Sequence, residues 1–169
     1  MIYGDVITDP TFPPLLTGEK VSKDVDPFVK AISASMMGCD AGTVFYAEDQ
    51  ETMRAAITLA PETPLKDSVS VVHALMLSLA DGLGALGPPE LAVHFVWPSQ
   101  FKVNAARCGE LRFKASTTDP DAVPEWLVVG LTIPFVRPET VEAGSDPSQT
   151  WLHEEGCIEL TVPQMIESW

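Results

Sequence analysis

The clearest structural signal in this 169-residue sequence is the segment LKDSVSVVHALMLSLADGLGAL, residues 65–86. Its apolar residues recur at alternating spacings of four and three, at Leu65, Val69, Val72, Met76, Leu79, Leu83 and Leu86. That spacing places them on one face of an α-helix. We therefore predict a long helix whose apolar stripe packs on a sheet, and glycines and prolines at positions 82–89 are expected to end it.

Strand-like segments lie on both sides of this helix. They are rich in β-branched and aromatic residues and fall at 43–47, 54–60, 91–97, 101–103, 107–116 and 126–135. The last, WLVVGLTIPF, is nearly all apolar, as in a strand buried on both faces. The segments 101–103 and 107–116 suggest a hairpin turning at residues 104–106. Strands combined with one long central helix indicate an α+β fold with a mixed sheet.

The two ends of the chain carry weaker signals. Residues 1–23, with three prolines and two glycines, are expected to form an extended N-terminal arm. Residues 24–37 suggest a helix capped by Asp24 or Asp26, with Phe28, Ile32 and Met36 on one stripe. A short helix, VPQMIESW, closes the chain. We expect residues 24–169 to be a single domain.

The overall charge excludes several classes of partner. Ten Lys and Arg against 24 Asp and Glu give a formal net charge of −14, which disfavours binding to nucleic acids or anionic membranes. The sequence contains no run of about 18 apolar residues, and its N-terminus does not resemble a signal peptide. Three widely spaced cysteines suggest reduced thiols in a cytoplasmic protein, and no metal-ligand spacing is present.

A local reversal of charge stands out against this acidic background. Lys102, Arg107, Arg112 and Lys114 fall within thirteen positions. Simple strand alternation places Arg107 on the core face together with Leu111, and Arg112 and Lys114 on a solvated face. Arg107 then contacts either a bound anion or a carboxylate of the protein in a structural ion pair.

Four segments, in this order, resemble motifs of the biotin/lipoate protein ligase family. AGTVFYAEDQETMR (41–54) is similar to the family strand that ends in A-E-x-Q before a glycine–arginine loop. FVWPSQFKVNAARCGEL (95–111) resembles W-P-N-D followed by a hairpin and K-x-x-G-I-L. WLVVGLTIP (126–134) resembles V-V-x-G-I-G-I-N, and TWLHEEG (150–156) resembles T-S-L-x-E-x-G.

The resemblance covers roughly residues 24–169 and implies a catalytic domain with a mixed, mostly antiparallel sheet and packed helices. The C-terminal small domain of many biotin ligases is not expected. For an active member it implies ATP and biotin or lipoate as ligands, and a biotinyl or lipoyl carrier domain as partner. The candidate ligand-binding residues are Gln50, Arg54, Trp97, Lys102, Arg107 and Gly109.

Several family positions are changed in this chain. Met53 and Ala55 replace glycines of the loop that wraps the adenylate, where close approach of the backbone to phosphate favours glycine. Ser99 and Gln100 replace the Asn and Asp that follow W-P. The family lysine is replaced by Arg107 or by Ala106, depending on the direction of counting. No catalytic residue is assigned.

Three functions remain open at this point. The chain is a divergent relative that binds a small carboxylic acid, an acyl-adenylate-like ligand or a carrier domain. Alternatively it is an active ligase or acyltransferase, in which Arg54, Lys102 and Arg107 stabilise developing negative charge. The third alternative is a non-catalytic interaction module on the same scaffold.

Overall fold

One mixed sheet of seven strands organises the protein. The computed structural model describes residues 8–169. The strands are β1 (Thr17–Val21), β2 (Thr43–Ala47), β3 (Thr52–Leu59), β4 (Val93–Val96), β5 (Gln100–Val103), β6 (Ala106–Ala115) and β7 (Leu127–Pro134). Their order across the sheet is β1-β2-β3-β7-β6-β5-β4, and all neighbours are antiparallel except the parallel pair β1–β2. The predicted α+β fold with a mostly antiparallel sheet is confirmed.

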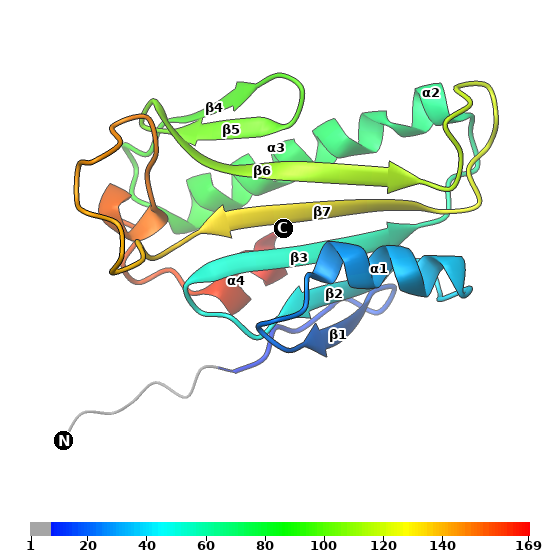
Figure 1. The fold of residues 1–169 in the computed structure, drawn as a ribbon, viewed down its shortest axis with the longest axis horizontal. Coiled ribbons are helices and arrows are strands. Elements are labelled where there is room, and N and C mark those ends of the chain that lie inside the picture. The colour runs from blue at the N-terminus through cyan, green and yellow to red at the C-terminus, as the bar shows by residue number, and fades with distance from the viewer. Residues whose placement is uncertain (1–7) are drawn as a thin grey trace.

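Helices cover the two faces of the sheet unequally. They are α1 (Pro27–Met36), α2 (Leu65–Ser68), α3 (Ser70–Leu86), the 3-10 turn η1 (Leu152–Glu155) and α4 (Val162–Ser168). In Figure 1, α1 crosses in front of β2 and β3, whereas α3 and α4 lie behind the sheet. In Figure 1 no helix lies in front of β4 and β5, so side chains that point forward from these two strands are not covered by one.

The central strand β7 joins the two hydrophobic cores. It pairs along its whole length with β3 and for most of it with β6. Leu127, Val129, Leu131 and Ile133 belong to the larger core on the α3 side, whereas Val128 belongs to the smaller core under α1. The nearly continuous apolar sequence of this strand follows from its burial on both faces.

The long helix predicted over residues 65–86 forms as α2 and α3, with Val69 between them. Val72, Met76, Leu79 and Leu83 of the predicted stripe are buried in the larger core, where they pack with residues of the sheet. By length and composition alone this 22-residue stretch, with a mean hydropathy of 1.7, could also span a membrane. The sequence criterion of an uninterrupted apolar run did not detect this property. In the structure 28% of this stretch is buried, and its buried stripe packs in the larger core.

The N-terminal segment differs from the predicted arm. Residues 17–21 form the edge strand β1 and pair with β2 through their backbones. Only Val21 of this strand packs against a hydrophobic core, and the other four residues are exposed. The strand therefore has no apolar alternation that a sequence pattern could reveal. Residues 1–7 of the predicted arm lie outside the described residues.

Helix α1 begins as predicted, with Asp26 accepting a hydrogen bond from the amide of Phe28 and Pro27 in the first turn. Of the predicted stripe, Phe28 and Ile32 pack against the smaller core as expected, and the prediction is wrong for Met36. Ala31 and Ala34 pack on the sheet, whereas Met36 is exposed. Small side chains on this face allow the helix to lie close to β3 and β7.

Candidate functional site

The β5–β6 hairpin holds the backbone of Arg107 in a fixed position. The hairpin turns at Asn104 and Ala105, whose φ values of 47° and 73° are those of a two-residue type I′ turn. The Arg107 amide donates to the Ser148 carbonyl at 2.8 Å, and the Thr150 amide donates to the Arg107 carbonyl at 2.9 Å. Both main-chain groups of Arg107 are therefore satisfied by the loop before η1, which leaves its side chain free to reach a ligand.

A β-bulge determines the direction in which Arg107 points. Phe101 pairs with Gly109 and Lys102 pairs with Arg107, so that Cys108 is the extra residue of β6. Cys108 is fully buried in the larger core, as is Leu111, and Arg107 consequently lies on the opposite face. The prediction that Arg107 enters on the core face is wrong. The predicted alternation of side chains holds from Glu110 onwards, but the extra residue at the bulge reverses it for Arg107 and Cys108.

Gly109 makes this bulge possible. Its φ of +145° is rarely adopted by other residues. A Cβ atom at this position would lie 2.5 Å from the Thr132 carbonyl oxygen and 2.6 Å from the Phe101 ring. The candidate residue Gly109 therefore cannot carry a side chain without a shift of its neighbours, which keeps the strand surface low beside Arg107.

A cavity of about 270 Å³ opens beside the bulge. It is lined by Arg107, Gly109, Glu110, Thr132, Pro134 and Gln149. Glu110 is paired with Thr132 across β6 and β7, and Arg112, two residues further along β6, points towards α1. The cavity therefore lies on the α1 side of the sheet, between the start of β6 and the end of β7, two strands that are neighbours in Figure 1.

The cations beside this cavity are not neutralised within the described residues. Ion pairs within residues 8–169 use seven of the ten basic side chains and leave Lys102, Arg107 and Lys114 without a partner. Lys102 and Arg107 lie directly opposite each other on β5 and β6. Like charges in such a pair repel each other, and a bound anion would relieve the repulsion.

Asp146 is a nearby carboxylate that Arg107 influences without forming an ion pair. The Ser148 hydroxyl donates to it at 2.6 Å and the Ser148 amide at 2.9 Å. These two hydrogen bonds, with a smaller contribution from the charge of Arg107, lower the pKa of Asp146. The carboxylate is thus engaged by Ser148, and the guanidinium of Arg107 remains available.

Three further polar side chains line the cavity and were missed by sequence reasoning as ligand contacts. Within residues 8–169, the hydroxyl of Thr132, the amide of Gln149 and the carboxylate of Glu110 form no hydrogen bond to the protein. Thr132 stands at the second glycine of the G-I-G-I-N-like strand, two positions after Gly130, and that substitution is a sequence signal that points to it. Gln149 reaches the cavity through the bridge between Arg107 and the loop, which has no local sequence signature.

The candidate residues Arg54 and Gln50 do not line this cavity. Arg54 donates to Asp49 at 3.2 Å and to the Lys23 carbonyl, so its guanidinium is part of a structural ion pair. Burial alone would raise the pKa of Asp49, but hydrogen bonds from the Glu51 and Thr52 amides and the charges of Lys23 and Arg54 outweigh it, and the pKa is lowered. Gln50 is exposed in the turn between β2 and β3 and lines a separate cavity.

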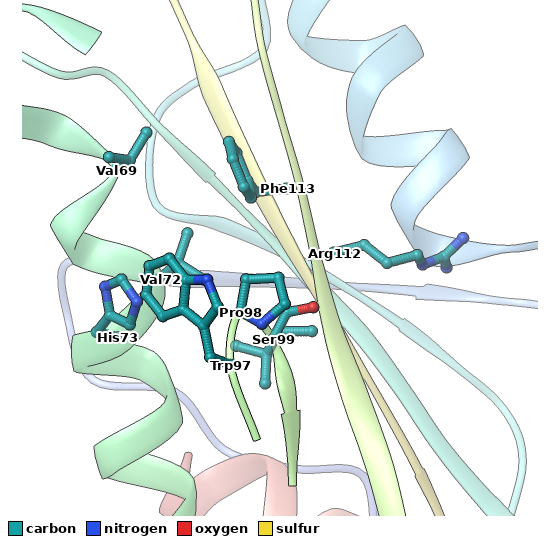
Figure 2. Close-up of a pocket in the computed structure, with 9 residues that line it drawn as sticks. Val69, Val72, His73, Trp97, Pro98, Ser99, Arg112 and Phe113 are labelled. Atoms are coloured by element: carbon teal, nitrogen blue, oxygen red, sulfur yellow. The ribbon is translucent and has the colours of Figure 1, made fainter. Parts of the chain in front are cut away.

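Trp97 lies on the opposite side of the sheet from Arg107. It lines a mostly apolar cavity of about 550 Å³ beside the N-terminal half of α3. Its indole stacks on the His73 ring, with centroids 5.3 Å apart and an interplanar angle of 9°. Figure 2 shows both rings beside Val72, with Phe113 further along β6. The candidate residues Trp97 and Arg54 therefore do not share one cavity with Arg107.

Arg112 also departs from its predicted role on a solvated face. Its side chain points away from the Trp97 cavity in Figure 2. It pairs with Asp26 at 3.0 Å, and its guanidinium carbon lies 4.6 Å from the centre of the Phe28 ring. The ion pair and the cation–π contact together connect the start of α1 to β6, although these residues are distant in sequence.

The stretch that corresponds to the family's glycine–arginine loop is a strand in this chain. Met53 and Ala55 are buried in the larger core and pair with Ile133 and Leu131 of β7. Their backbones are thus in the sheet ladder between β3 and β7. A backbone used in this way cannot also wrap a phosphate group.

The sheet order, the helices on its two faces and the open strand surface beside α1 define a domain of the biotin protein ligase type. A model of the Biotin/lipoate A/B protein ligase family matches residues 12–169, and the chain belongs to this family.

Among solved structures, a biotin protein ligase-like protein of unknown function from Silicibacter is 44% identical, with a TM-score of 0.87 over 95% of this chain and 69% of that one. A mutant biotin protein ligase from Aquifex aeolicus in complex with biotin is 15% identical, with a TM-score of 0.67 over 91% of this chain and 66% of that one. The biotin protein ligase of Leishmania major in complex with biotin is 12% identical, with a TM-score of 0.62 over 93% and 71%. The chain thus spans about two thirds of the length of these proteins. A search of curated proteins finds no match.

Proposed function

We propose that this chain is a divergent member of its family that binds a small carboxylic acid in the cavity beside Arg107. One observation carries the proposal. Lys102 and Arg107 face each other across β5 and β6, and neither forms an ion pair within residues 8–169, in a chain of formal net charge −14. Acidic side chains are abundant in this protein, yet none in the described part of the chain forms an ion pair with either of these two cations. Their position therefore favours a binding site for an external anion.

The groups around the cavity suit a carboxylate. A guanidinium can donate two parallel hydrogen bonds to one carboxylate, and such a contact contributes roughly 1.5–3 kcal/mol when it is partly desolvated. Thr132 and Gln149 add neutral donors at the same cavity. The volume of about 270 Å³ lies just below the range usual for drug-sized ligands, which favours a small acid over a nucleotide.

Titration calorimetry with octanoate, lipoate and biotin tests this proposal. We expect Arg107→Ala to weaken the acid that binds best by about ten- to a hundredfold, because the charge-assisted hydrogen bonds are lost. The melting temperature should stay close to that of the wild type, because the side chain has no protein partner within the described residues. Trp97→Ala is the matched control and should leave the affinity unchanged, since Trp97 lies in the other cavity. An acid whose affinity depends on Trp97 and not on Arg107 would contradict the proposal.

Docking of a biotinyl or lipoyl carrier domain is the second candidate function. The observation that favours it is a group of exposed aromatic side chains, Phe95, Trp97 and Phe113, with exposed fractions of 45%, 79% and 48%. Large exposed apolar side chains that gather on one surface are typical of interaction sites. A carrier domain that binds the wild type should bind Trp97→Ala at least tenfold more weakly, as surface plasmon resonance would measure. Equal binding of both proteins would remove this candidate.

A further inference from the structure

The cavity beside Arg107 also contains a negative charge. Glu110 lines it together with Arg107, and its carboxylate is exposed at the rim. Within residues 8–169 no ion pair joins Glu110 to Arg107 or to any other cation. A cation and an anion therefore share one small cavity without neutralising each other.

The strand geometry gives the approximate separation of the two charges. Arg107 and Glu110 are three positions apart on β6, with the bulge between them. At a rise of roughly 3.3 Å per residue, their Cα atoms lie about 7–10 Å apart. Each strand partner keeps its side chain on the cavity face, Lys102 opposite Arg107 and Thr132 opposite Glu110. Asp146 is the other carboxylate near Arg107, and it is held by Ser148.

We propose that the ligand of this cavity is dipolar: an ω-amino acid or a similar acid whose carboxylate contacts Arg107 and whose ammonium group, several bonds away, contacts Glu110. This inference rests on the proposed binding of a carboxylic acid at Arg107 and specifies the chemistry of the far end of that acid. An α-amino acid does not fit as well, because its two charges are adjacent. A simple fatty acid would leave the Glu110 carboxylate without a partner beside an apolar chain.

Three six-carbon acids separate these possibilities in titration calorimetry. The probes are 6-aminohexanoate, its isomer 2-aminohexanoate and unsubstituted hexanoate. We expect 6-aminohexanoate to bind the wild type about three- to fivefold more tightly than the other two, which is the upper part of the range for an ion pair at an exposed carboxylate. Glu110→Gln should abolish this preference and leave hexanoate binding as strong or stronger. Arg107→Ala should weaken all three.

The outcomes distinguish the two proposals. Arg107-dependent binding without a preference for 6-aminohexanoate, or a preference that persists in Glu110→Gln, overturns the dipolar ligand and leaves the carboxylate site standing. If none of the acids, including octanoate, lipoate and biotin, binds in an Arg107-dependent way, both proposals are overturned. Glu110→Gln is nearly isosteric at an exposed position, so its fold can be verified by an unchanged melting temperature.

Discussion

Arg107 is positioned by its main chain and left free at its side chain. Its amide and carbonyl are hydrogen-bonded to Ser148 and Thr150. The Glu155 carboxylate accepts hydrogen bonds from Asn104 in the hairpin turn and from Thr150, and so links this segment to the hairpin. Backbone hydrogen bonds fix the position of this residue, so that its guanidinium does not need an ion pair to do so. This division of roles suits a ligand contact better than a structural ion pair.

Arg54 and Asp49 illustrate the opposite arrangement, in which the charges serve the structure. The Asp49 carboxylate is buried and accepts hydrogen bonds from the Glu51 and Thr52 amides at 3.0 and 3.3 Å. It also lies 3.2 Å from Arg54 and 3.5 Å from Lys23. The lowered pKa of Asp49 means that its charged form is favoured in the folded protein.

We expect Asp49→Asn to lower the free energy of unfolding at pH 7 by about 1.5–3 kcal/mol, the usual contribution of hydrogen bonds to a charged group. Because the folded-state pKa is depressed, this contribution is present above the ordinary pKa near 4 and is lost as the pH falls through the folded-state value. Urea denaturation at pH 7 and pH 3 measures it, with exposed Glu48→Gln as the control. A difference between wild type and variant that is the same at both pH values would contradict this account.

At the scale of elements, β6 shows what a sequence pattern can and cannot reveal. The strand, its partner β5 and the hairpin turn were predictable from β-branched residues and the spacing between the two strands. The alternation from Glu110 to Ala115 was also correct for Leu111 and Ala115, which are buried. The bulge at Cys108 was not predictable, because it depends on the contact of Gly109 with Thr132 and Phe101 on neighbouring strands.

The same limit applies to the candidate site as a whole. Of the six candidate residues, Arg107 and Gly109 line the cavity and Lys102 lies opposite Arg107, whereas Arg54, Gln50 and Trp97 lie elsewhere. Their separation follows from long-range contacts. Gln149 reaches the cavity by a backbone bridge, and Asp26 pairs with Arg112 from a distance of 86 residues along the chain. Neither contact leaves a local pattern in the sequence.

The helix α3 provides a test at the same scale. Met76 is 4% exposed in the larger core, whereas its neighbour Leu77 is 56% exposed. We expect Met76→Asp to unfold the domain at 25 °C, because it buries a charge with no partner, at a cost of more than about 4 kcal/mol. Leu77→Asp should change the stability by about 0.5 kcal/mol or less. Circular dichroism during urea denaturation compares the two variants, and a folded Met76→Asp protein would show that the helix packs differently.

At the scale of the whole molecule, the family scaffold is kept while the surface that would hold a nucleotide is changed. The sheet and the helices on its two faces resemble those of biotin protein ligases. The place of the glycine–arginine loop is taken by β3, whose backbone pairs with β7 along its length. We therefore expect the proposed small acid to bind without ATP, and Mg-ATP alone to bind weakly, with a dissociation constant above about 1 mM.

An NMR titration of the ¹⁵N-labelled protein tests the central claim most directly, because it locates a ligand as well as detecting it. On addition of octanoate or 6-aminohexanoate, we predict chemical-shift changes at the Arg107, Gly109, Thr132 and Gln149 amides that saturate together. The indole N–H signal of Trp97 should stay unchanged, and 1 mM Mg-ATP should leave the Arg107 and Gly109 amides unperturbed. Saturable shifts at Trp97 and His73 without changes at Arg107 and Gly109 would contradict the assignment of the acid-binding site.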